Sequence, residues 1–219
     1  MRHPHGLRAA AGLPTGPEIG EFYEGGYFAG YISQNANGVA THGLLVAPEA
    51  NGSNGGTALQ FKESNNGNTY GSSTFDGATN TASQANDGAH PAATYCAGLT
   101  INTYSDWYLP AQWELEIAYF NLKPTTENND TGHGGNPYAV PSRATFNGAF
   151  YTNNPRNPDQ TTVSIFQDGG SEDFPDTEHW SSTQHNSTTG KVIRFNDGTP
   201  SNISKTDEYR VRAFRKFAV

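Results

Sequence analysis

The chain has 219 residues, which suits one domain with a long loop or one domain with a tail. Charged residues make up only 16% of it and aromatic residues 12%, which excludes a disordered chain, since such chains have few aromatics and a high charge. The net charge of −8 disfavours nucleic acid as a partner, because neutralising a phosphate backbone takes clustered Lys and Arg.

The cysteine content and the lack of long apolar runs limit the cellular compartments in which the protein can be made. Cys96 is the single cysteine, so no intrachain disulfide can form. No stretch is apolar for long enough to cross a membrane, and the first residues lack the apolar core of a secretory signal peptide. We therefore expect a protein made in a reducing cytoplasm, without a signal peptide and without membrane insertion.

The N-terminal half begins with a predicted tail and continues with short strands. Residues 1–17 mix basic residues, Gly and Pro without periodicity, which predicts a tail that is either disordered or anchored to another subunit. Aromatic and glycine residues, and apolar runs ended by proline, predict the strands that follow. These strands are expected at 19–33, as a pair turning at Gly25-Gly26, at 42–48, and at 58–62 within loops that span 49–87.

Two helices are predicted in the middle of the chain. The first covers 90–99, with a proline in its first turn and an apolar face that includes Cys96. The second covers 112–121, because Trp113, Ile117 and Phe120 recur at i, i+4 and i+7. We expect Cys96 to be a buried structural thiol, since a reactive thiol needs an electropositive, partly exposed site.

The C-terminal half predicts a long loop followed by strands. Residues 123–178 are rich in Asn, Pro and Gly, and scattered apolar residues predict that this segment packs down as an ordered loop. The remaining strands are expected at 106–110, 179–184, 191–196 and 208–217. Trp107, Trp113 and Trp180 each lie in a predicted strand or helix, so all three are expected in the core.

Six short motifs follow one another in a characteristic order. They are Gly25–Gly30, His42–Pro48, Asp76–Thr81, Asp106–Pro110, Trp180–Thr183 and Val211–Arg215. Together they resemble the Lcl C-terminal domain family, which occurs in collagen-like bacterial adhesins and in phage genomes, and the resemblance spans residues 19–217. The family often has Tyr before the fifth motif and Glu after it, where this chain has His179 and Gln184.

The resemblance implies an α+β, C-type-lectin-like fold over residues 18–219. Such a fold has small antiparallel sheets, two short helices, a long loop region, and a first and a last strand that pair. The resemblance also implies homotrimers and a binding role, because phage members of the family resemble tail-fibre or receptor-binding proteins. One cysteine cannot perform the paired-cysteine chemistry of the enzymes that share this architecture, so we expect no catalytic residues and no enzyme.

Candidate ligand-binding residues lie on polar loops. The segment 184–190 links two predicted strands and is wholly polar, and amide and hydroxyl side chains match the hydrogen bonding of sugars. A plain solvated hairpin is the alternative interpretation. The predicted ligand-binding residues are Gln184, His185, Asn186, Thr188, Tyr151, Asn153 and Asn154.

Two charged clusters have competing interpretations. Calcium takes six to eight oxygen ligands, but the acidic cluster matches no calcium-loop spacing, so a solvated loop is preferred and no cofactor is expected. The arginines near the C-terminus are expected to pair with carboxylates or a neighbouring subunit rather than with an anionic glycan. The acidic cluster is Asp168, Glu172, Asp173 and Asp176, and the arginines are Arg210, Arg212 and Arg215.

The sequence thus predicts a bacteriophage virion adhesin or fibre protein. Its polar loops would bind a host-surface glycan or protein, while its tail, residues 1–17, would hold other virion proteins. The alternatives are a head- or tail-decoration or fibre-joining subunit without receptor binding and a bacterial surface adhesin. An enzyme acting on surface polysaccharide is the most distant alternative, because no pair of carboxylates stands out.

Overall fold

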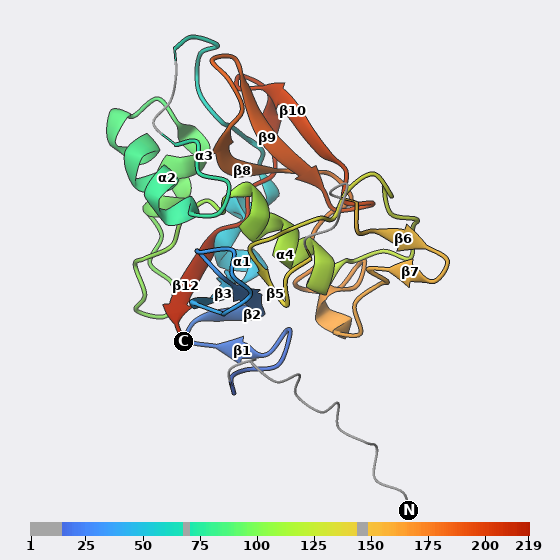
Figure 1. Ribbon diagram of the computed structural model, residues 1–219. Helices are drawn as coiled ribbons and strands as arrows, with labels where there is room; N and C mark the ends of the chain where they lie inside the picture. The colour runs from blue at the N-terminus through green and yellow to red at the C-terminus, as the bar shows by residue number, and fades with distance from the viewer. Residues whose placement is uncertain (1–14, 68–70, 144–148) are drawn as a thin grey trace, which may run out of the picture.

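The computed structural model describes residues 15–67, 71–143 and 149–219 of the chain (Figure 1). The described part is a mixed α+β structure of small antiparallel sheets and helices, which confirms the predicted class. Most of the predicted tail, residues 1–17, lies outside the described residues.

Two antiparallel sheets enclose the longest helix, α4 (Gln112–Leu122), which contacts both of them (Figure 1). The larger sheet has the order β1-β2-β3-β12, with β5 also pairing with β2, and the second has the order β10-β9-β8. The strands of these sheets are β1 (Phe22–Tyr23), β2 (Gly26–Ile32), β3 (His42–Val46), β5 (Ala139–Val140), β8 (Glu178–Gln184), β9 (Thr189–Arg194), β10 (Pro200–Ser204) and β12 (Phe214–Ala218).

Shorter elements complete the described structure. The strands β4 and β11 form one small pair, and β6 and β7 form another. These elements are α1 (Glu49–Gly52), η1 (Asn54–Gly56), β4 (Leu59–Gln60), α2 (Gly77–Gln84), η2 (Ala85–Asp87), α3 (Pro91–Ala97), β6 (Thr152–Asn153), β7 (Arg156–Asn157), η3 (Ser164–Phe166) and β11 (Glu208–Tyr209).

The predicted direct pairing of the first and last strands is wrong. The last strand, β12, pairs with β3, and β3 lies between it and β2. Leu44, Leu45 and Val46 of β3 are fully buried, so this strand occupies the middle of the sheet, where both of its edges are hydrogen-bonded. The N- and C-terminal strands therefore belong to the same sheet but are not hydrogen-bonded to each other.

The helix α2 was not predicted, because the face that it buries is polar. Asn80, Thr81 and Gln84 are almost fully buried, and each bonds to a backbone carbonyl. The Gln84 Nε2 atom, for example, donates to the Ser182 carbonyl at 2.8 Å. Asp76 caps the helix by accepting from the Thr79 N–H. No apolar periodicity marks such a helix, so the segment 49–87 was predicted to be loops apart from one strand.

The strand predictions nearer the C-terminus are only partly correct. The segment 106–110 is extended but pairs only through a bridge between Tyr108 and Phe214, and 208–217 is divided into β11 and β12. The strand β10 was not predicted. Its sequence offers little apolar alternation, and its pairing with β9 places it in the sheet.

In residues 123–143 and 149–178, the long loop that follows α4 is joined to the domain through Asn129, while residues 144–148 of the predicted loop, with Phe146, lie outside the described residues. The Asn129 Oδ1 atom accepts from the Tyr119 hydroxyl and from the Lys123 ammonium, each at 2.8 Å. Its Nδ2 atom donates to the carbonyls of Thr152 and Pro158 at 3.0 and 2.9 Å. A single buried amide thus joins α4 to both ends of the β6–β7 hairpin.

The core prediction holds for two of the three tryptophans. Trp107 and Trp180 are buried, and their indole N–H groups donate to the carbonyls of Tyr104 and Leu59. Trp113 is only half-buried. It was expected in the core because of its helical spacing, so this part of the core prediction is wrong.

Pairing with carboxylates, predicted for the three C-terminal arginines, is found for Arg212 and Arg215, while Arg210 donates to the Gly56 carbonyl. Arg212 is 1% exposed and forms ion pairs with Glu49 and, at 2.8 Å, with Glu172. Arg215 pairs with Glu24 at 3.1 Å and with Asp106 at 2.5 Å. These contacts hold the last strand segment against the rest of the domain.

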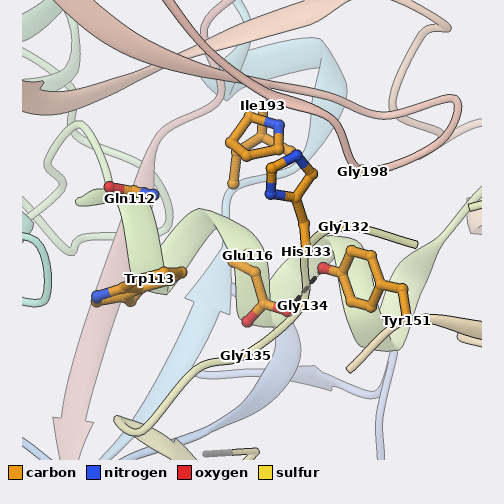
Figure 2. A pocket seen from close by; sticks show the side chains of 11 residues that line it. Gln112, Trp113, Glu116, Gly132, His133, Gly134, Gly135, Tyr151, Ile193 and Gly198 are labelled. Carbon is orange, nitrogen blue, oxygen red and sulfur yellow. Dashed lines mark hydrogen bonds between the residues drawn. The ribbon is translucent and has the colours of Figure 1, made fainter. Parts of the chain in front are cut away.

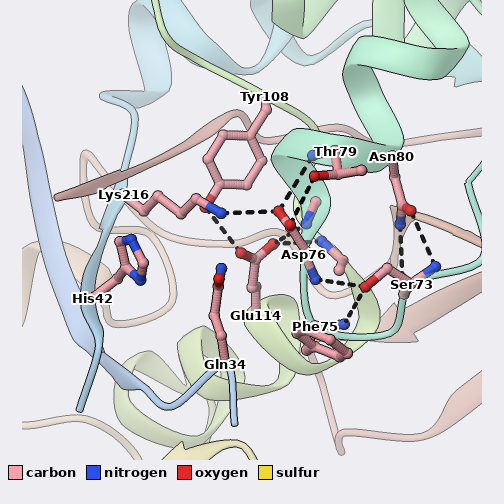
Figure 3. A network of polar contacts seen from close by, with 12 residues as sticks. Gln34, His42, Ser73, Phe75, Asp76, Thr79, Asn80, Tyr108, Glu114 and Lys216 are labelled. Carbon is pink, nitrogen blue, oxygen red and sulfur yellow. Dashed lines mark hydrogen bonds and ion pairs between the residues drawn. The ribbon is translucent and has the colours of Figure 1, made fainter. Parts of the chain in front are cut away.

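A third polar network joins α2, α4 and β12 (Figure 3). The buried Glu114 carboxylate accepts from the N–H groups of Ala111 at 2.8 Å and Gly77 at 3.0 Å, and from the Tyr108 hydroxyl at 3.0 Å. The Lys216 ammonium pairs with Asp76 at 2.8 Å. Burial raises the pKa of Glu114 to about 7, so this carboxyl group changes charge near neutral pH.

Candidate functional site

The strands β8 and β9 are joined by a polar turn, residues 184–189, which we name the tip hairpin. His185, Asn186 and Thr188 are exposed there. The Asn186 Oδ1 atom accepts from the N–H groups of Thr188 and Thr189, both at 2.9 Å, and the His185 N–H donates to the Thr189 carbonyl at 3.0 Å. The turn is therefore closed by its own hydrogen bonds, and it presents the His185 and Thr188 side chains to solvent.

The buried Lys205 side chain supports the tip hairpin through hydrogen bonds. The Lys205 Nζ atom donates to the Ser187 carbonyl at 2.9 Å and to the Gln184 Oε1 atom at 3.1 Å. Burial lowers the pKa of Lys205 to about 8. Gln184, a predicted ligand-binding residue, is thus a support of the turn, while its neighbours His185 and Thr188 are the outward-facing groups.

The other predicted ligand-binding residues lie elsewhere. Asn153 and Asn154 are exposed, but the Asn153 amide is bonded to the backbone of Asn129 in both directions, at 2.7 and 3.0 Å. Tyr151 is buried, which contradicts its expected place on an exposed loop. Its aromatic ring packs against Tyr119 and Phe120 of α4.

The tip hairpin and the Tyr151 region do not form one surface. The tip hairpin meets β9 at Thr189, whereas Tyr151 packs near Gly198, beyond the other end of that strand. A strand rises about 3.3 Å per residue, so the two ends of β9 lie roughly 16 Å apart. The sequence had predicted one ligand-binding surface from residues of both regions, but the structure places these residues at separate sites.

Tyr151 lines a cavity of about 370 Å³ that the sequence did not reveal (Figure 2). The cavity lies between the first turns of α4, the loop 132–135 and the turn that joins β9 to β10. The side chains from α4 are Gln112, Trp113 and Glu116. The facing side chains are His133, Tyr151, Ile193 and Pro200.

A buried carboxylate forms part of the cavity wall. Glu116 is 3% exposed, and its Oε1 atom accepts from the Tyr151 hydroxyl at 2.7 Å (Figure 2). Its Oε2 atom accepts from the Asn136 amide and from the Arg143 guanidinium, with which it forms an ion pair. Three donors from the long loop therefore fix the orientation of this carboxylate.

The loop 132–135 closes against Tyr151 because it is made of glycine on either side of His133. Gly134 has a φ of +91°, and a Cβ atom there would lie 2.1 Å from the Tyr151 ring. The His133 ring is half-buried, on the side of the cavity next to Ile193 (Figure 2), with its Nε2 atom 3.4 Å from the Asp130 carboxylate. Substituting Gly134 would displace the loop or the ring.

Two signals in the sequence point to this cavity in retrospect. Glu116 interrupts the apolar run of α4, and Gly132-His133-Gly134-Gly135 is a glycine-rich segment around a single imidazole. Neither signal identifies Tyr151 as the hydrogen-bond partner of Glu116, because Tyr151 lies 35 residues further along the chain.

The described residues contain no group of three or more His, Cys, Asp or Glu side chains that could hold a metal ion. Within the acidic cluster, Glu172 pairs with Arg212, and Asp173 accepts from the Gly169 N–H at 2.9 Å. Cys96 is fully buried, and burial raises the pKa of its thiol, so the thiolate needed for nucleophilic chemistry is disfavoured.

Comparison with known protein families and with curated proteins found no match for this chain. In the part of the chain that the structure describes, no helix is long and apolar enough to cross a membrane.

Proposed function

We propose that the chain is a virion adhesin with a C-type-lectin-like fold, which binds a host-surface glycan or protein through the tip hairpin. The resemblance of its motifs to the Lcl C-terminal domain family supports the fold. So does the packing of Trp180, from the fifth motif, in the core.

The observation that carries the proposal is the construction of the tip hairpin. His185 and Thr188 are exposed, yet the backbone that bears them is held by the Asn186 cap and by Lys205. A surface that is ordered before binding loses little conformational entropy when it meets a partner. Weak contacts at each copy would be multiplied by a homotrimer and by the number of copies on the virion.

Binding of the labelled, purified protein to intact host-like cells tests this function. The His185→Ala/Thr188→Ala double variant removes the outward-facing groups, together with the 3.1 Å bond from the Thr188 hydroxyl to the Asn186 Oδ1 atom. It leaves the backbone bonds of the Asn186 cap and the Lys205 contacts in place. A matched control, Thr162→Ala/Ser171→Ala, removes two exposed hydroxyls from the long loop. We expect saturable binding that the first variant loses and the control retains.

Two outcomes would count against the proposal. Loss of cell binding by both the tip variant and the control variant would show that the tip hairpin is not the specific binding site. Absence of binding to every strain, together with tight attachment of the protein to other virion components, would favour a decoration or fibre-joining subunit instead.

A further inference from the structure

We propose that the cavity beside Glu116 is a second binding site, which accepts one neutral pyranose ring, either free or at the end of a glycan. This site lies at the opposite end of β9 from the tip hairpin and has different residues. The inference therefore goes beyond the proposed function and does not depend on it.

The volume of the cavity limits the ligand to about one sugar ring. Ligand pockets in proteins commonly measure about 300–1,000 Å³, and this cavity of about 370 Å³ is near the lower end. It is partly open to solvent, and Gly132 of its lining is exposed. A longer glycan would place its terminal ring inside and the rest of its chain in solvent.

The polar groups of the cavity wall suit hydroxyl groups. An ionised carboxylate has about four acceptor positions, and Glu116 uses three of them for Tyr151, Asn136 and Arg143. The remaining position of this buried carboxylate can accept from a ligand hydroxyl, and such charge-assisted bonds are strong. Gln112 adds an amide that both donates and accepts, and His133 adds an imidazole.

The charges around the cavity argue against an anionic ligand. The cation nearest to Glu116 is Arg143, which is already paired with that carboxylate and stacks over Phe120 at 4.0 Å. Asp130, next to His133, adds a further negative charge. The described lining residues therefore include one carboxylate, Glu116, and neither Lys nor Arg, so a phosphate or a sialic acid would be repelled while a neutral sugar would not.

Apolar surfaces complete the match to a sugar ring. Trp113 is half-buried beside the cavity, and Tyr151, Ile193 and Pro200 line its other sides. A pyranose has hydroxyl groups at its edge and C–H groups on its faces, so it can bond to the polar groups while its faces pack on these side chains.

Titration calorimetry of the purified full chain with single sugars tests the site. The ligands are glucose, galactose, mannose and N-acetylglucosamine, with sialic acid and glucose 6-phosphate as anionic counterparts. We expect at least one neutral sugar to bind with a Kd on the order of 1 mM, and the anionic sugars to bind at least tenfold more weakly.

Two single variants locate the binding without disturbing the fold. Gln112→Ala and His133→Ala keep the backbone bonds of these residues, from the Gln112 N–H to Thr183 and from the Tyr151 N–H to the His133 carbonyl. We expect each to weaken sugar binding at least tenfold with an unchanged melting temperature. The matched control is the His185→Ala/Thr188→Ala variant, which should bind the sugar as wild type does.

The results separate the two sites. Sugar binding that both cavity variants retain, or no binding by any neutral sugar, overturns the cavity site and leaves cell binding through the tip hairpin intact. Loss of cell binding in the tip variant with unchanged sugar binding supports both proposals. Sugar binding without any cell binding supports the cavity site alone.

Discussion

Replacing Glu114 by Gln tests how strongly burial perturbs the carboxyl group at the centre of the network in Figure 3. Burial raises the pKa of Glu114 from its ordinary value of 4.5 to about 7, and the Ala111 N–H and Lys216 only partly oppose this effect. A glutamine amide oxygen can still accept from the N–H groups of Ala111 and Gly77, and its NH₂ group can donate to the Tyr108 hydroxyl oxygen. The variant therefore retains the bonds and removes the charge.

The sign of the effect follows from the direction of the pKa change. Because the folded-state pKa of Glu114 lies above the unfolded value, the folded protein binds the proton more tightly. The stability from this group is fully present below pH 4.5 and is lost as the pH rises through about 7. At about 1.4 kcal/mol per pH unit, the difference between the two pKa values corresponds to a loss of about 3 kcal/mol.

Urea denaturation followed by tryptophan fluorescence, at several pH values between about 5 and about 8, measures this loss. We expect the unfolding free energy of the wild type, relative to that of Glu114→Gln, to fall by about 2–3 kcal/mol over this range. Other titrating groups contribute equally to both proteins and cancel in the difference. Parallel pH profiles for the two proteins would refute the argument that burial dominates the charge state of Glu114.

Three further predictions concern other buried groups. Arg212→Ala leaves the carboxylates of Glu49 and Glu172 without their shared cation, so urea denaturation should show a loss of about 3–5 kcal/mol, and a loss below about 1 kcal/mol would contradict the pairing. Lys205→Met removes the bonds that support the tip hairpin, so hydrogen exchange of its amides should quicken while amides in β2 stay unchanged. Cys96 should react with iodoacetamide only in denaturant, and rapid alkylation of the folded protein would show that its thiol is accessible.

Much of the secondary structure followed from local sequence patterns. The strands β2 and β3 and the helices α3 and α4 lie where short apolar runs, glycine turns and helical spacing predicted them. These patterns involve residues within a few positions of one another, so the side chains that decide them are neighbours in the chain. The exposed polar tip hairpin was predicted for the same reason, from a polar segment between two apolar strands.

The candidate cavity and the buried polar groups depend instead on tertiary contacts. Glu116 and Tyr151 meet across 35 residues, and Trp113 is half-buried at the edge of the cavity they line. The polar face of α2 is buried only because the carbonyls of distant segments accept its hydrogen bonds. The sequence by itself determined the apolar strands β2 and β3, the helices α3 and α4 and the polar turn, because local spacing marks them, whereas α2 and β10 carry no such pattern. Which polar groups are paired, buried or left to line a cavity was decided only when the whole chain packed, because each depends on partners far along the chain.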